Sequence, residues 1–179
     1  MIVPDLEWRT VDFRRVSLVQ RTANLCPCAP ADPQDCICAA AVKRRYLGKL
    51  SGPLLDRVDL RVQMHAVRAG AFSGTEAEST AQVRRRVAQA RAAAAERWRP
   101  HGFNTNAEVS GALLRRKFRP GNTTMTPLQK ALDRGLLSIR GLDRTLRVAW
   151  SLTDLAGGVS PGPEEVAAAL SFRQPGAGR

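Results

Sequence analysis

The sequence predicts a mainly α-helical protein in which a long helical part follows a shorter segment that mixes helix and strand patterns. Apolar residues recur at helical spacing through residues 79–173, whereas all four cysteines and the strand-like alternation fall within residues 1–66. Glycines and small residues fill the stretch between these parts, as in a linker. We therefore expect a divergent N-terminal segment at 1–20, the end of an α/β core with a cysteine-rich loop at 21–66, a linker at 67–78, a helical domain at 79–173 and a tail at 174–179.

The composition is strongly basic. The chain has 179 residues, with 28 Lys and Arg against 16 Asp and Glu, which leaves a net charge of +12. Almost all of the positive charge is arginine, which pairs bidentately with phosphate, so nucleic acid or a nucleotide is a favoured partner. The alternative is that codon bias alone produces this composition, which is rich in Arg, Ala and Gly. No apolar run approaches the roughly 20 residues of a membrane span, and there is no signal-peptide core, so we expect a cytoplasmic protein without a membrane partner.

The first part of the chain predicts short elements around the cysteine-rich loop. Residues 14–19 have the pattern of a short strand, and residues 24–39 that of a loop rich in Cys, Pro and Asp. Residues 39–50 favour a helix, which a Ser-Gly-Pro turn then stops. Apolar and polar residues alternate over 58–64, which is the period of a half-buried strand.

The second part predicts helices separated by proline and glycine. Serine and threonine caps mark the starts of these helices, and Pro or Gly marks their ends. In chain order, we expect a helix capped by Ser79 and closed by Pro100, a short helix around Leu113, Leu114 and Phe118, a helix started by Thr126 and Pro127, a long amphipathic helix from Ser138 to Gly157, and a last helix started by Ser160 and Pro161.

The four cysteines form two C-x-C pairs. Cys26 and Cys28 are separated from Cys36 and Cys38 by seven residues. Four thiolates in one short loop suit tetrahedral zinc, although the usual spacing within a pair is C-x2-C. Two alternatives remain open: disulfides, which the lack of a secretory signal disfavours, and reduced cysteines in a tight turn. Neither of the two histidines of the chain, His65 and His101, is expected to bind a metal.

Residues 50–60 form a second motif, in which a Ser-Gly-Pro turn leads into a short helix ending at Asp56, Arg57 and Asp59. If a strand follows, Arg57 stands at the edge of a sheet, from which it can reach a neighbouring subunit. In a nucleotide-driven ring, such an arginine stabilises the charge on a phosphate bound to the adjacent subunit, as arginine fingers do. The alternative, which spacing alone favours, is a surface ion pair of Arg57 with Asp56 or Asp59.

Several runs of the sequence carry a resemblance to a known family. They are Asn24-Leu25-Cys26-Pro27-Cys28, the second cysteine pair, Arg45-Tyr46, residues 50–60, and residues 138–149 with 153–157. Together they resemble the magnesium-chelatase-like AAA+ ATPases of the ComM/YifB type. Residues 138–149 and 153–157 look like that family's C-terminal lid signature. The resemblance implies the end of an AAA+ α/β core followed by a helical lid. It also implies an ATP-driven ring motor that acts on DNA during recombination and uptake.

The resemblance implies roles for individual residues. Asn24 matches the sensor-1 asparagine, which orients the attacking water. Arg57 matches the arginine finger offered to the adjacent subunit's nucleotide. Arg140 matches the sensor-2 arginine, which contacts the phosphates bound to its own subunit. Arg144 and Arg147 are expected at the helix surface or in the packing of the lid, and the alternative for either is an auxiliary contact. The four cysteines match the family's cysteine-rich insertion, which keeps zinc open as a cofactor.

Two parts of an ATPase are missing from the sequence. It contains no G-x-x-x-x-G-K-[S/T] loop for the β- and γ-phosphates and no apolar strand ending in Asp-Glu for magnesium. We therefore expect no ATP hydrolysis by this chain alone, and ATP and Mg²⁺ to bind only with a complete core. One alternative is a zinc-dependent nucleic-acid-binding module built on the cysteine-rich loop and on the arginine-rich helices around Arg84, Arg85, Arg86, Arg115 and Arg116. The others are a truncated remnant without activity and an adaptor that joins the ring of a complete ATPase.

Overall fold

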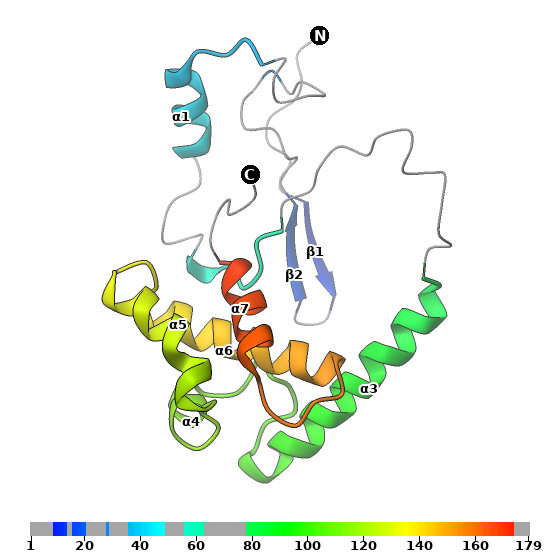
Figure 1. Ribbon diagram of the computed structural model, residues 1–179. Coiled ribbons are helices and arrows are strands. Elements are labelled where there is room, and N and C mark those ends of the chain that lie inside the picture. Colours follow the sequence, from blue (N-terminus) through cyan, green and yellow to red (C-terminus); the bar gives the residue numbers. More distant parts are fainter. Residues whose placement is uncertain are drawn as a thin grey trace. The chain divides into compact units, whose positions relative to one another are not determined.

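The computed structural model describes residues 9–13, 16–20, 28, 36–48, 56–62 and 78–173 (Figure 1). The described part of the chain is mainly helical, which confirms the predicted fold class. Contacts divide the chain into two compact units. The first unit is formed by residues 1–51 and 63–73, and the second, here called the helical unit, by residues 52–62 and 74–179.

The first unit contains a short hairpin and one helix. Strands β1 (Arg9–Phe13) and β2 (Val16–Gln20) pair antiparallel, with Phe13 opposite Val16. The strand expected at 14–19 is therefore confirmed where it overlaps β2, whereas β1 was not foreseen. The helix expected at 39–50 is confirmed by α1 (Ala40–Gly48). The last two residues of that expected helix lie outside the described residues.

The helical unit begins as the sequence predicts. Helix α3 (Thr80–Trp98) starts at Ser79, whose Oγ accepts a hydrogen bond from the backbone N–H of Gln82 at 3.3 Å. The helix is followed by the 3₁₀ turn η3 (Arg99–His101), which contains Pro100, and by α4 (Gly111–Arg116). Helix α6 (Ile139–Leu155) starts at its expected cap, Ser138, and is followed by Gly157 in the left-handed conformation at φ 73°.

Two helix starts were predicted wrongly. Helix α5 (Asn122–Asp133) begins at Asn122, so Pro127 lies inside it instead of at its start. The proline ring removes one N–H from the helix, and the burial of Met125 and Leu128 on both sides of it offsets that loss. Helix α7 (Pro163–Ser171) begins at Pro163 instead of Pro161. The residue before Pro163, Gly162, donates its N–H to Glu165 Oε2 at 2.9 Å.

The strand expected at 58–64 was also predicted wrongly. Residues 58–62 form no strand, and residues 63 and 64 lie outside the described residues. The alternation did not mark a buried face, because Leu60 and Val62 are 49% and 63% exposed. The backbone of this segment instead bonds to the C-terminal end of α7, where the N–H of Arg61 donates to the carbonyl of Phe172 at 2.9 Å.

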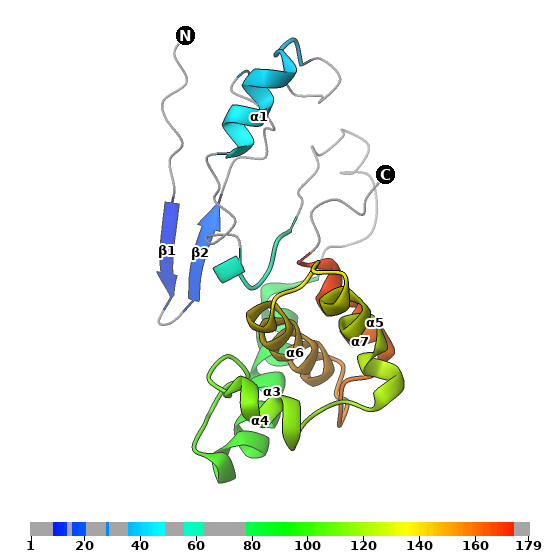
Figure 2. The same ribbon diagram turned by 90° about the vertical axis from the view of Figure 1, so that its left-hand side faces the viewer.

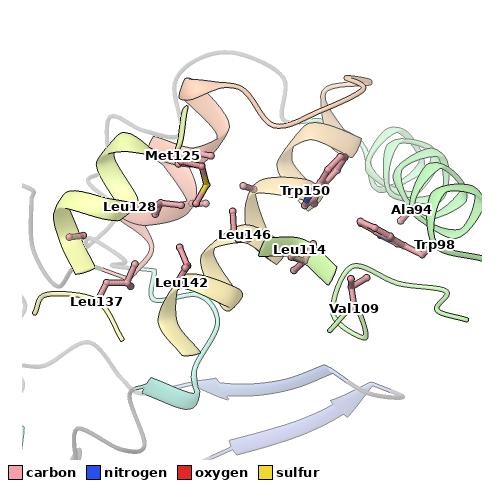
Figure 3. Close-up of a cluster of buried hydrophobic side chains, with 14 residues drawn as sticks. Ala94, Trp98, Val109, Leu114, Met125, Leu128, Leu137, Leu142, Leu146 and Trp150 are labelled. Atoms are coloured by element: carbon pink, nitrogen blue, oxygen red, sulfur yellow. The ribbon is translucent and has the colours of Figure 1, made fainter. Parts of the chain in front are cut away.

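The core of the helical unit forms around α6, which contacts α3, α4, α5 and α7 (Figure 2). Figure 3 shows its side chains Leu142, Leu146 and Trp150 among residues of the other helices. Trp98, Leu146 and the α7 residue Val166 are fully buried. Each such side chain stabilises the fold by roughly 1.5–3 kcal/mol, so this unit has a hydrophobic core of its own. None of the helices in the described part of the chain is long and apolar enough to cross a membrane.

Candidate functional site

The turn at Asp56 and Arg57 is bound to the helical unit through a buried arginine. Arg173, which follows α7, is 8% exposed and donates to the carboxylate of Asp56 and to the carbonyl of Val58, both at 3.0 Å. The hydroxyl of Ser138 donates to the same carboxylate at 3.2 Å. Asp56 therefore joins the end of α7 to the start of α6, and the turn that carries Arg57 is fixed to both helices.

Burial makes Arg173 dependent on these partners. Burial lowers the pKa of Arg173, and the neighbouring carboxylate of Asp56 opposes that shift. A guanidinium keeps its charge at any ordinary pH, so a buried one needs partners for its N–H groups. Gly141 of α6 lies beside this side chain and leaves room for Leu137, because a Cβ placed at Gly141 would lie only 2.7 Å from Leu137 Cδ1.

A second contact holds the same segment at the surface. Asp59 forms an ion pair with Arg144 of α6. Both side chains are partly exposed, so the pair contributes little, on the order of 0–1 kcal/mol. The sequence left open an ion pair of Arg57 with Asp56 or Asp59. Within the described part of the chain, these two carboxylates bind Arg173 and Arg144, and Arg57 forms no ion pair.

Arg57 and Arg140 lie on elements that meet. The turn at Asp56 and Arg57, held by Arg173 and Ser138, is here called the docked turn, and Arg57 is exposed on it. Arg140 is exposed as the second residue of α6, two positions after Ser138. Because Ser138 binds the residue that precedes Arg57, both arginines belong to one corner of the helical unit. Two exposed guanidinium groups beside a helix N-terminus favour anions such as phosphate. Asn24, the expected sensor-1 residue, lies outside the described residues.

The end of α6 is held by a buried polar network. The carboxylate of Asp154, with 1% of its side chain exposed, pairs with Arg97 of α3. It also accepts a hydrogen bond from Asn106 Nδ2 at 2.8 Å, and Asn106 Oδ1 in turn accepts the indole N–H of Trp98 at 2.6 Å. The run 153–157, which resembles the lid signature, thus contains a residue that fixes α6 to α3.

The other arginines singled out in the sequence bind within the helical unit. Arg147 donates to the carbonyl of Val109 at 2.8 and 3.0 Å, so it packs on the lid surface. Arg115 pairs with Asp143 of α6. Arg116, the last residue of α4, is exposed. On α3, Arg86 pairs with Glu78, while Arg84 and Arg85 are exposed.

The first unit brings three of the four cysteines together. The Sγ atoms of Cys28, Cys36 and Cys38 all lie within 4.8 Å of one another. Cys26 and His65 lie outside the described residues. The other histidine, His101, lies in the helical unit, where its ring packs edge-on against that of Phe118 at a centroid distance of 5.2 Å.

No sequence pattern indicates Arg173 or Ser138 as a partner of the turn at Asp56 and Arg57. Arg173 is separated from Asp56 by 117 positions, and no spacing rule connects residues so far apart. Its place in the sequence offers one weak signal. Arg173 is a charged residue that directly follows the last apolar helical pattern of the chain.

Two family models match the chain. The model described as magnesium chelatase, subunit ChlI C-terminal, matches residues 77–173, and the one described as magnesium chelatase, subunit ChlI, matches residues 8–72. The first of these covers more than half of the chain. The chain therefore belongs to the magnesium chelatase ChlI family, and it is a magnesium-chelatase-like protein of the ComM/YifB type.

Its relatives are longer proteins. An uncharacterized protein of Mycobacterium tuberculosis strain H37Rv is 81% identical over 157 residues, which are 88% of this chain and 31% of the relative. Competence protein ComM of Haemophilus influenzae is 33% identical over 131 residues, which are 72% of this chain and 25% of ComM. The uncharacterized protein YifB of Salmonella typhimurium is 30% identical over 138 residues, which are 76% of this chain and 26% of YifB. The chain thus spans less than a third of the length of these relatives.

Proposed function

We propose that this chain forms the lid and arginine-finger part of an ATP-driven ring motor that acts on DNA. The observation that carries the proposal is the docked turn, which holds Asp56 on two helices and leaves Arg57 exposed. Membership of the magnesium chelatase ChlI family supports it. In this proposal Arg57 contacts the nucleotide of the neighbouring subunit, and Arg140 contacts the nucleotide of its own subunit.

The chemistry of the finger is electrostatic. A guanidinium placed beside the transferred phosphoryl group stabilises the negative charge of the transition state, and such residues accelerate hydrolysis by about 10³–10⁵-fold. That effect requires an accurately placed side chain. Arg173 and Ser138 fix the backbone on which Arg57 stands, while the exposed side chain of Arg57 remains available to a second subunit.

The same contacts couple the two arginines. Arg140 lies in the first turn of α6, and the cap of that turn, Ser138, donates to Asp56. A shift of α6 that follows a change of nucleotide at Arg140 therefore also moves the turn that carries Arg57. The nucleotide bound to one subunit would thus influence the nucleotide site of the neighbouring subunit through the lid.

Binding of ATP and Mg²⁺ needs groups beyond this sequence. The sequence contains no phosphate-binding loop with a G-x-x-x-x-G-K-[S/T] pattern, so the β- and γ-phosphates and the metal ion are held elsewhere in the complete site. This chain supplies the two arginines and the helices that position them. Asn24 is proposed as a further contact on the strength of its sequence pattern.

The charge of the chain supports a DNA partner. A net charge of +12 and the exposed residues Arg84 and Arg85 on α3 suit contacts with phosphate groups. Such contacts release counterions, so DNA binding by the complete motor is expected to weaken as salt rises, and replacing both arginines with Ala should reduce the slope of that dependence by about 1–2 units.

Complementation of ATPase activity tests the proposed function. An ATPase of this family that lacks its own lid, but still binds nucleotide, is mixed with this chain, and phosphate release is measured. We expect a gain in activity with the unsubstituted chain and a loss of at least about 10³-fold of that gain with Arg57→Ala. The matched control is Arg134→Ala, which removes an exposed arginine at the end of α5.

The outcomes are distinct. The proposal is supported if Arg134→Ala retains the gain, Arg57→Ala removes it, and both variants have the circular dichroism spectrum of the unsubstituted chain. A gain that survives Arg57→Ala would exclude the finger role of this residue. A lidless ATPase that binds the chain but gains no activity would exclude the proposed function as a whole.

A further inference from the structure

The three cysteines of the first unit are arranged in a way that packing alone does not explain. Cys36 and Cys38 precede α1, and Cys28 comes from eight positions earlier in the sequence. Their Sγ atoms nevertheless lie within 4.8 Å of one another, with 3.5 Å between Cys28 and Cys36. Cys28 is exposed and the other two are half-buried, so no hydrophobic core draws these thiols together.

The spacing of the sulfur atoms fits a tetrahedral metal. A Zn–S bond of about 2.3 Å at the tetrahedral angle puts neighbouring sulfurs about 3.8 Å apart. The Cys28 to Cys36 distance of 3.5 Å and the upper limit of 4.8 Å for the set lie on either side of that value. A disulfide, with about 2.05 Å between its sulfurs, joins only two of them and leaves the convergence of the third unexplained.

The adjoining helix provides a suitable electrostatic setting. Ala39 precedes α1, its carbonyl accepts the N–H of Lys43 at 3.2 Å, and its side chain offers no oxygen to cap the helix. Anions are stabilised at a helix N-terminus, and a zinc site with three or four thiolates carries a net negative charge. The first turn of α1 contains no acidic residue, and Lys43, Arg44 and Arg45 follow within the helix.

We propose that Cys28, Cys36 and Cys38 bind one zinc ion that fixes the cysteine-rich loop to the start of α1. Cys26 lies outside the described residues, and we expect it to be the fourth ligand from the sequence alone, because its C-x-C pair repeats that of Cys36 and Cys38. Four protein ligands close the coordination shell, so the ion is structural and does not activate water. The site is independent of the nucleotide contacts proposed above, and it deepens the account of how the first unit folds.

Metal analysis of the full chain tests this site. The chain is purified without chelator from a zinc-containing medium, and its zinc content is measured by mass spectrometry. We expect about one zinc ion per chain, as for other four-ligand structural sites. Replacement by Co²⁺ should give the thiolate-to-cobalt absorption and the visible bands of a tetrahedral site. Zinc should also slow alkylation of the thiols until a chelator is added.

Substitutions separate this site from adventitious binding. Cys28→Ser and Cys36→Ser should each abolish stoichiometric zinc, whereas His101→Asn, which removes a metal-binding residue type from the helical unit, should retain it. If a cysteine variant fails to fold, cobalt absorption and thiol protection in the unsubstituted chain decide the question. Zinc far below one ion per chain, a cobalt spectrum without thiolate absorption, or zinc retained by Cys36→Ser would each overturn the proposal.

Discussion

The two units of the chain are stabilised in different ways. The buried hydrophobic side chains of residues 78–173 form the core of the helical unit, between Ala90 and Ala169. In the described part of the first unit, Ile37 is 94% exposed and Val42 of α1 is 41% exposed. The helical unit therefore obtains its stability from apolar burial, whereas the cysteine-rich loop and α1 depend on other contacts.

This difference shows how function is divided along the chain. The helical unit is a rigid support, because α6 is packed on four other helices and its two ends are held by polar contacts. The proposed nucleotide contacts, Arg57 and Arg140, stand on that support as exposed side chains. In the first unit, where Ile37 and Val42 are exposed, we expect the proposed metal ion to change stability most.

The largest effect is expected from the buried ion pair of the helical unit. Asp154→Ala leaves the guanidinium of Arg97 largely buried without its carboxylate, which should lower the free energy of unfolding by about 3–5 kcal/mol. Urea denaturation followed by tryptophan fluorescence measures this change. The matched control is Glu78→Ala, which breaks an exposed ion pair with Arg86 and should cost about 0–1 kcal/mol. Equal losses would contradict the assignment of a buried network.

A slightly smaller effect is expected from the apolar core. Leu146→Ala removes a fully buried side chain of α6 and should cost about 2–5 kcal/mol, because it leaves a cavity among four helices. Val42→Ala in α1 removes an exposed side chain and should change stability by less than about 0.5 kcal/mol. The same denaturation assay compares the two. A large effect of Val42→Ala would show that the first unit also has an apolar core.

The anchor of the turn should have a local effect. Arg173→Gln removes the charged hydrogen bonds to Asp56 and Val58, which are each worth about 1.5–3 kcal/mol. Hydrogen exchange of the Arg61 amide, which donates to Phe172, should become at least about tenfold faster, while amides in the middle of α6 change less. Arg134→Gln serves as the exposed control. Unchanged exchange at Arg61 would show that Arg173 does not hold the segment.

Much of the helical unit could be predicted from the sequence, because its signals are local. Ser79 and Ser138 cap the helices they were expected to start, since a serine hydroxyl satisfies N–H groups within three residues. The start at Thr126 was wrong because tertiary burial around Met125 outweighs the presence of Pro127 in the helix. Local sequence patterns indicate which segments are helical, but they do not show how contacts with distant residues shift the helix ends.

The candidate site was predictable only in part. The motif around Arg57 is recognisable from its composition, and the cysteine pairs are recognisable from their spacing, because each lies within a short run of the sequence. The contact of Arg173 with Asp56 was not predictable, because nothing local to either residue indicates a partner 117 positions away. The alternation over residues 58–64 predicts a strand, whereas in the described residues 58–62 the backbone N–H of Arg61 bonds to the end of α7.

Hydrogen exchange of the full chain with zinc and with a chelator tests the difference between the two units most directly. We expect chelation to accelerate exchange at least about tenfold in peptides covering residues 36–48 and to leave exchange unchanged in peptides covering α3, α5 and α6. Exchange that is insensitive to the chelator throughout the chain would contradict the metal-dependent first unit. Acceleration in both units alike would contradict the independent core of the helical unit.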